Sequence, residues 1–169
     1  MTSTREDSQP SQPLGLVWAI KRSFVEYVRR MSDGKGWIGD RAVPFSDDRI
    51  FFTYDADASR PGAWSFQGDV RFSGHFGMLF VRLANPTVTL VDGRASLTIE
   101  ESSETARADR LELVTMRLDL METVGGVEYW YGTDAVLAAG GVELFNNVYA
   151  VGEPFEPLVL VVPAELTDP

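Results

Sequence analysis

Hydrophobic residues recur with a helical period in only one long stretch of the chain, residues 14–31. Five apolar residues there follow one another at intervals of three or four positions, which places them along one face of an α-helix. The Ser-Asp-Gly sequence at residues 32–34 provides a stop, because glycine readily adopts the left-handed conformation that ends many helices. The pattern therefore predicts one long N-terminal helix packed on a core. Its apolar residues are Val17, Ile20, Phe24, Val28 and Met31.

Two hydroxyl side chains lie at the edge of this apolar face. Tyr27 borders it, and Ser23 stands four residues earlier on the same flank, one helical turn away. A phenol in this position meets both the packed face and the polar face of the helix. We therefore expect a site there that is partly shielded from solvent, with Tyr27 as its functional residue.

Beyond residue 34 the chain alternates apolar and polar residues with the period of two that is typical of half-buried strands. The alternation is clearest from Trp64 to Phe72. Gly74 and Gly77 then enclose the single histidine, so we expect a β-hairpin with His75 at its tip. Further strands are predicted at residues 49–54, 87–91, 94–99, 109–122, 127–137 and 158–162.

Three local signals refine this β-rich picture. The Asp92-Gly93 pair is a strong hairpin signal, and a change of apolar parity along residues 109–122 indicates a bulge around Val114. A short late helix is expected at residues 140–146, because the apolar residues there do not all face inward from a strand. The predicted fold is mainly β: an antiparallel β-sandwich or partly open barrel with one long N-terminal helix and one short late helix.

Length and composition fit one globular domain. The chain has 169 residues, of which 44% are hydrophobic, and its first 13 are polar and proline-containing. We therefore divide it into a disordered tail, residues 1–13, and a single domain, residues 14–169. The tail lacks the features of a secretory signal, so the expected location is the cytoplasm, or the cell envelope if a signal has been removed.

Charge and residue counts exclude several classes of function. The net charge of −10 argues against nucleic acid as a partner, and the longest apolar run, residues 157–164, is too short for membrane insertion. With no cysteine and one histidine, thiolate and multi-histidine metal sites are excluded. The sequence lacks a G-x-S-x-G elbow, a G-x-G-x-x-G motif and a P-loop, so we expect a protein that is not an enzyme.

One local cluster of basic residues contrasts with the negative net charge of the chain. Residues 21–35 contain five basic and two acidic side chains. Either these cations form a solvated face that complements the helix dipole, or they form a docking patch for a small anionic ligand beside Tyr27. The candidates for such a patch are Arg29, Arg30 and Lys35.

Tyr27 and His75 together can form a known kind of iron site. A phenolate is an anionic ligand of ferric iron and an accepted axial ligand of haem, and an imidazole N–H can stabilise it by a hydrogen bond. Taken separately, a tyrosine on a helix edge is usually a core residue with its hydroxyl at the surface, and a histidine in such a turn is usually structural or merely exposed. Phe24 and Phe76, which neighbour the pair in sequence, are candidates for lining an aromatic slot, although both are also ordinary core residues.

The sequence also contains three distinctive blocks: LVWAIKRSFVEYV (residues 16–28), FQGDVRFSGHFGML (66–79, followed by Asn85-Pro86) and AVLAAGGVELFNNVYAVGEPFEP (135–157). In composition and order they resemble the Htaa domain of actinobacterial haem-uptake proteins. The resemblance implies a β-rich domain in which the tyrosine of K-x-S-F-x-x-Y-V, here Tyr27, ligates haem iron. The histidine of G-H-x-G, here His75, would hydrogen-bond that tyrosine.

Family members bind haem at or outside the cell envelope and usually carry a signal peptide, a membrane anchor and repeated domains. This sequence shows a single copy without such segments, which would fit haem buffering, delivery or sensing inside the cell. The leading hypothesis is a non-enzymatic protein that binds ferric haem b and exchanges it with a donor or acceptor protein. Its expected site residues are Tyr27 as the iron ligand, with His75, Ser23, Phe24, Phe76 and Arg29.

Two alternatives remain open at this stage. The first is an Htaa-like module that has lost haem and binds another apolar ligand or a protein partner. The second is a haem enzyme, such as a peroxidase or a haem-degrading oxygenase. The second lacks a distal histidine for acid–base work, because His75 is the only one.

Overall fold

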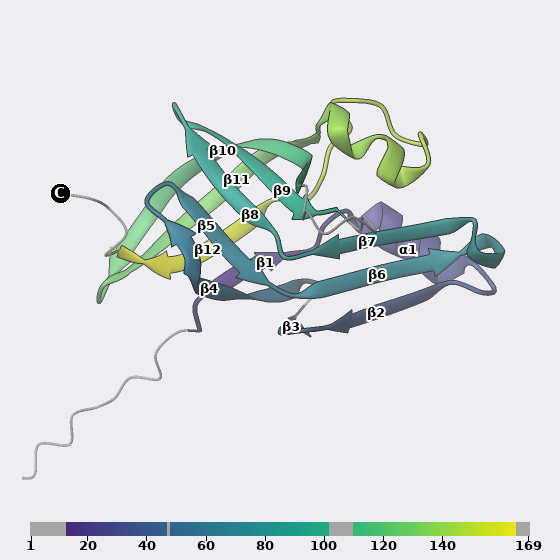
Figure 1. Cartoon of the computed structure of the whole chain (residues 1–169), viewed down its shortest axis with the longest axis horizontal. Coiled ribbons are helices and arrows are strands. Elements are labelled where there is room, and N and C mark those ends of the chain that lie inside the picture. The colour runs from purple at the N-terminus through teal and green to yellow at the C-terminus, as the bar shows by residue number, and fades with distance from the viewer. Residues whose placement is uncertain (1–12, 47, 102–109, 165–169) are drawn as a thin grey trace, which may run out of the picture.

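The computed structural model describes residues 13–46, 48–101 and 110–164 (Figure 1). The tail predicted for residues 1–13 lies outside these ranges except for Pro13. Most of the charged loop expected at residues 100–108 lies outside them as well. Neither prediction is therefore tested by the structure.

Within the described ranges, eight antiparallel strands close into a barrel, in the order β1-β12-β11-β10-β9-β8-β5-β4. β1 pairs with β12 on one side and with β4 on the other, which closes the sheet. A ninth strand, β3 (Ala42–Pro44), pairs with the start of β4. The bounds are β1 Gly15–Trp18, β4 Ile50–Arg60, β5 Ala63–Gln67, β8 Thr87–Val91, β9 Arg94–Glu100, β10 Arg110–Val124, β11 Val127–Leu137 and β12 Leu158–Pro163.

The mainly β, antiparallel prediction is confirmed, but its sandwich or partly open form is wrong, because the barrel is closed. The long N-terminal helix is also wrong. Residues 15–18 form β1, and the α-helix, α1 (Arg22–Arg30), has nine residues. All four residues of β1 are buried between β12 and β4, and Ile20 then turns the chain with a φ of 66°. A run buried on both faces has no alternation, so its apolar residues matched a helical period by coincidence.

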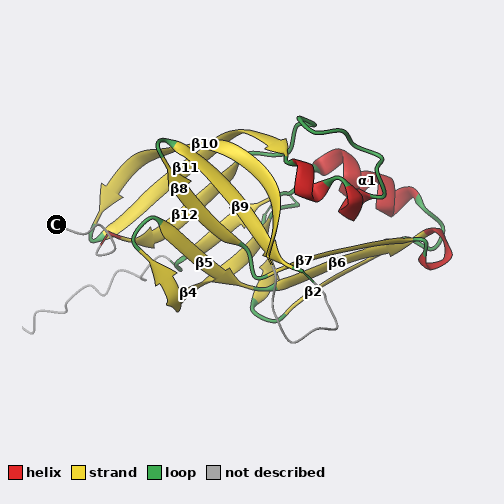
Figure 2. Ribbon diagram, turned by 45° about the horizontal axis from the view of Figure 1, so that its top comes forward, coloured by secondary structure: helices red, strands yellow, loops and turns green. Residues whose placement is uncertain are grey.

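A second sheet extends from the barrel and carries the helix (Figure 2). It has three strands in the order β2 (Lys35–Gly39), β6 (Asp69–Gly74) and β7 (Leu79–Ala84). α1 packs on one face of this sheet through Phe24, whose ring meets Phe72 and Phe145 edge-on at centroid distances of 5.3 and 5.1 Å. At the far end, β6 and β7 are joined by a 3₁₀ turn, η1 (His75–Gly77). His75 therefore lies at a hairpin tip, as predicted.

Several local predictions are confirmed. β8 and β9 form the hairpin expected at Asp92-Gly93, and the register of β10 against β9 shifts between Glu112 and Val114, where the bulge was expected. The short late helix is present as two 3₁₀ turns, η2 (Ala139–Gly141) and η3 (Glu143–Phe145). Phe145 is buried against Phe24, so this segment closes over the helix.

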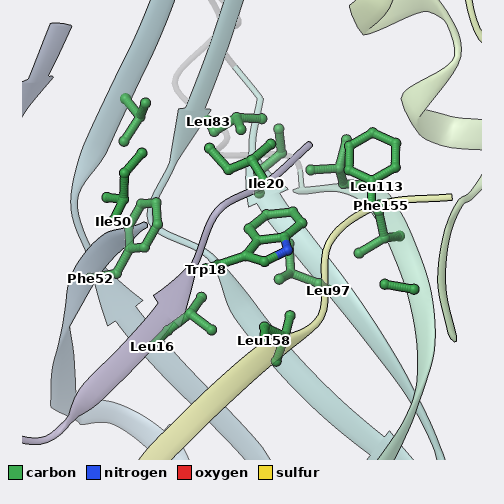
Figure 3. Close-up of a cluster of buried hydrophobic side chains, with 14 of the residues drawn as sticks. Leu16, Trp18, Ile20, Ile50, Phe52, Leu83, Leu97, Leu113, Phe155 and Leu158 are labelled. Atoms are coloured by element: carbon green, nitrogen blue, oxygen red, sulfur yellow. The ribbon is translucent and has the colours of Figure 1, made fainter. Parts of the chain in front are cut away.

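The barrel interior is a continuous apolar core (Figure 3). Trp18 lies near its centre, almost fully buried, and its indole Nε1 donates a hydrogen bond to the carbonyl of Glu156 at 2.8 Å. In the part of the chain that the structure describes, no helix is long and apolar enough to cross a bilayer. The rigid barrel thus serves as a base from which the small sheet and α1 project.

Asp69 is a buried carboxylate at the base of the small sheet. It accepts hydrogen bonds from Arg71 at 3.1 Å and from Arg82 at 2.9 Å. Burial raises the pKa of the Asp69 carboxyl, but the two guanidinium groups more than offset this, so its pKa lies below the usual value. The ion pairs therefore stabilise the fold whenever Asp69 is ionised.

Asp69→Asn is expected to lower the free energy of unfolding by about 2 kcal/mol at pH 7, because two charged donors lose a charged acceptor. A depressed carboxyl pKa contributes stability above the unfolded-state value, and that contribution fades as the pH falls through the folded value. The difference between wild type and variant should therefore narrow below about pH 4. Urea unfolding of both proteins between about pH 7 and pH 3 measures this difference in the free energy of unfolding.

A difference that did not change with pH would contradict a stabilising role of the ionised Asp69. The matched control is Asp119→Asn, because Asp119 is exposed and its ion pair with Arg117 is long, at 3.9 Å.

Candidate functional site

Two segments far apart in the sequence meet at the end of the small sheet that points away from the barrel (Figures 1 and 2). Tyr27 reaches this point from α1, and His75 from the η1 turn. The phenol oxygen Oη of Tyr27 lies 2.6 Å from Nε2 of His75, a short hydrogen bond whose donor depends on the imidazole tautomer. Tyr27 is 49% exposed, so the pair is accessible from solvent.

The η1 turn holds His75 in an uncommon backbone conformation. His75 and Phe76 have φ values of 49° and 56°, in the left-handed region that ordinary residues seldom adopt. Both of their backbone N–H groups point at the carboxylate of Asp33, which accepts from Phe76 at 2.7 Å and from His75 at 3.2 Å. The Phe76 N–H, together with that of His75, lowers the pKa of the Asp33 carboxyl. Asp33 is therefore ionised at neutral pH and acts as the anchor of this turn.

Exposed apolar side chains lie on the hairpin tip that carries His75. Phe76 is 95% exposed and Met78 is 81% exposed, both at the hairpin tip. The side-chain amide of Asn146 donates to the carbonyl of Met78 at 3.1 Å and so ties the segment after η3 to the tip. That segment carries Val148, which is also largely exposed. Such a surface suits a flat apolar ligand.

A second tyrosine lies near the first. Burial, followed by the nearby charges of Glu153 and Tyr27, raises the pKa of the Tyr149 phenol. Below it, the buried Lys21 Nζ lies 5.0 Å from the centre of the Tyr149 ring and pairs with Glu153 at 3.0 Å. Sequence reasoning named neither Tyr149 nor Asp33 as a site residue, although Tyr149 lies in the third block that resembles the Htaa domain.

The remaining expected site residues lie in different places. Ser23 is exposed on the Tyr27 flank of α1, as predicted. Phe24 is only 3% exposed and packs in the core between Phe72 and Phe145, so we correct its assignment as a residue lining an open slot. Phe76 keeps its place beside the pair.

Arg29 also needs correction. Two positions along a helix from Tyr27, it lies on the opposite flank of α1, where its guanidinium pairs with Asp48 at 2.8 Å. A cavity of about 350 Å³ lies on that flank, with Arg29, Asp48 and Trp37 among its lining residues. Of the other two cations, Arg30 is exposed and forms a long 4.0 Å pair with Glu26. Lys35 is exposed on β2, opposite Ser73 of the strand that leads to the tip.

Among the described residues, no three histidine, cysteine or acidic side chains gather in a way that would hold a metal ion. The Tyr27–His75 pair offers two possible donor atoms, the phenol oxygen and an imidazole nitrogen. A phenolate suits ferric iron, and the imidazole beside it is placed to take up or return a proton. The geometry thus agrees with a single-tyrosine site.

Comparison with known proteins decides the family. A sequence profile of the Htaa family matches residues 14–161, most of the chain. The chain belongs to the Htaa family. The resemblance noted in three sequence blocks is therefore confirmed. No curated protein sequence matches this Htaa chain.

Solved structures share the fold of this Htaa chain. The N-terminal domain of HtaA from Corynebacterium glutamicum has a TM-score of 0.71 at 19% identity, covering 90% of this chain and 97% of that domain. The C-terminal domain of the same protein gives 0.70 at 18% identity, covering 90% and 96%. Heme binding protein HtaB from the same organism gives 0.68 at 22% identity, covering 88% and 91%. These likenesses establish the fold.

Proposed function

We propose that this chain binds haem, with Tyr27 Oη as the axial ligand of ferric iron and His75 as the hydrogen-bond partner of that oxygen. The observation that carries the proposal is the 2.6 Å contact between Tyr27 Oη and His75 Nε2, on an exposed surface and between two separate elements. Support also comes from the family and from the solved relative that is described as a heme binding protein.

The pair explains how a phenol binds iron at neutral pH. A free phenol has a pKa of about 10, so it must lose a proton before it ligates a metal. Nε2 of His75 lies within hydrogen-bond distance and accepts that proton when the phenol ionises. The resulting N–H then donates to the phenolate and disperses its charge. Bound haem would supply a Lewis-acidic ferric centre whose positive charge favours the phenolate.

The surroundings fit the rest of the ligand. Haem is flat and apolar with two carboxylates at one edge, and it needs apolar contacts together with cations. Phe76, Met78 and Val148 offer apolar contacts, while Arg30 and Lys35 offer exposed cations. Haem is thus the cofactor class that this donor set and surface suit best.

We further propose that the role is binding rather than turnover, in haem uptake, trafficking or buffering with a donor or acceptor protein. The chain has one histidine, and its Nε2 is committed to Tyr27. Acid–base work on an iron-bound substrate normally requires a further side chain on the open face of the haem. In this proposal His75 serves the iron ligand, so a catalytic role would need a further acid–base group.

Titration of the purified protein with ferric haem tests the proposal. We expect saturable one-to-one binding with the visible spectrum of tyrosinate-ligated ferric haem. Iron-free protoporphyrin is the control, and it should bind more weakly because it cannot use the phenolate. Absence of saturable binding would reject the proposal and favour another apolar ligand for the same face.

The variant His75→Ala tests the partner role. It should keep haem but with affinity reduced about tenfold, because the phenolate loses its hydrogen-bond donor. The charge-transfer band of the tyrosinate complex should shift, since the ligand oxygen then carries more charge. An unchanged spectrum would show that His75 does not contact the ligand in the complex, and His75→Gln, which retains a side-chain donor, should restore part of the affinity.

A further inference from the structure

Asp33 connects the two elements that carry Tyr27 and His75. It follows the end of α1 by three residues, so it belongs to the same continuous segment as Tyr27. Its carboxylate accepts both exposed N–H groups at the start of the η1 turn, from His75 and Phe76. The segment from Tyr27 to Asp33 therefore contacts the tip twice: once through the ring of His75 and once through its backbone.

The carboxylate matches a backbone that would otherwise be strained. Two consecutive left-handed residues, His75 and Phe76, direct successive N–H groups to one point, an arrangement that favours an anion. In the absence of Asp33 these residues would return to more common φ values, and the direction of the His75 side chain would change with them.

Close packing between the turn that carries Asp33 and the hairpin tip restricts how these two segments can lie against each other. A Cβ atom at Gly74 would lie 2.4 Å from Sδ of Met31 and 3.8 Å from the α-carbon of Gly34. Glycine at position 74 therefore lets the α1–β2 turn approach the hairpin tip closely enough for Asp33 to reach it. The sequence and the fold thus favour one register between the turn and the tip.

We infer that Asp33 is a positioning residue of the haem site, which holds the η1 turn so that Nε2 of His75 meets Tyr27 Oη. Asp33 does not touch the ligand in this account; it acts through His75. The inference rests on the proposed haem function, but its geometric part concerns the protein without haem and is testable there.

The first experiment uses the protein without haem. Because the chain has one histidine, its imidazole signals in NMR spectra are unambiguous. We expect a nuclear Overhauser contact between the rings of Tyr27 and His75, whose centroids are 5.8 Å apart, and an Nε2 chemical shift of a hydrogen-bonded nitrogen. Asp33→Ala should lose both features while the amide spectrum of the barrel is retained. Persistence of both features in Asp33→Ala would overturn the inference, whether or not haem binds.

The second experiment separates positioning from a general structural role. Asp33→Ala should reduce haem affinity about tenfold and shift the charge-transfer band in the same direction as His75→Ala. In a His75→Ala background, Asp33→Ala should change affinity less than about twofold, because both substitutions remove the same interaction. Equal effects in the two backgrounds would overturn the inference.

Two matched variants complete the test. Glu26→Ala removes one exposed carboxylate from α1, where Glu26 pairs with Arg30, so this variant should behave as wild type. Asp33→Asn keeps the size of the side chain but only one acceptor oxygen, so its effect should lie between those of wild type and Asp33→Ala. A loss of affinity in Glu26→Ala as large as that in Asp33→Ala would attribute the effect to net charge and overturn the positioning role.

Discussion

Tyr27→Phe should abolish tight haem binding, with a loss of affinity of at least about 100-fold, while the protein stays folded. The substitution removes only Oη, the proposed iron ligand, and leaves the ring in place. Since Tyr27 is half exposed and its one hydrogen bond runs to an exposed histidine, the free energy of unfolding should change by less than about 1 kcal/mol. Haem titration by visible absorption, with urea unfolding of the same samples, measures both quantities.

The control for this variant is Tyr131→Phe, which removes the phenol oxygen of a part-exposed tyrosine on β11 of the barrel. It should bind haem as wild type does. If Tyr27→Phe retained both the affinity and the tyrosinate spectrum, the ligand would have to be another group. Tyr149 would then be the first candidate, because it is a second phenol close to Tyr27.

Sequence patterns predicted most of the strands because half-buried strands carry their own signature. The Asp-Gly turn at residues 92–93 depends on local chemistry, and the structure has it. The alternating run from Trp64 to Phe72 is also extended, but the structure divides it at Gly68 into β5 of the barrel and β6 of the small sheet, which the alternation alone did not predict. The prediction of a long N-terminal helix failed because its first residues form a strand, β1, whose partners are distant in the sequence. β1 is buried by partners about 35 and 145 residues away, Thr53 and Val161 opposite Gly15, and no pattern within residues 15–18 records them.

Two residues of the candidate site could be predicted from the sequence because their residue types are uncommon in such positions. A lone histidine between two glycines, His75, and a tyrosine on a helix flank, Tyr27, were singled out before their contact was known, and the structure places them 2.6 Å apart. Asp33 was missed because its role depends on the backbone of a turn 42 residues away. Arg29 was misplaced because charge alone does not tell on which flank of α1 a cation finds its partner, here Asp48.

Phe24→Ala should lower the free energy of unfolding by about 4 kcal/mol, the largest effect on stability that we expect here. The ring of Phe24 is 3% exposed and packs edge-on against Phe72 of the small sheet and Phe145 of η3. Its removal leaves a cavity where helix, sheet and the late 3₁₀ turns meet, and these three elements cannot all close around it. Urea unfolding measures the loss, and Phe24→Leu should cost less because it fills part of the space.

Substitution of Phe24 also separates packing from ligand contact and so tests the sequence-based assignment of Phe24 to the haem site. If Phe24 only holds α1 against the sheet, Phe24→Leu should bind haem within about threefold of wild type once the folded fraction is taken into account. If its ring contacted haem, the haem affinity of the folded protein would fall by more than this in Phe24→Leu. The buried position of the ring favours the first result, and with it a site formed by the outer flank of α1 and the hairpin tip rather than by the core between them.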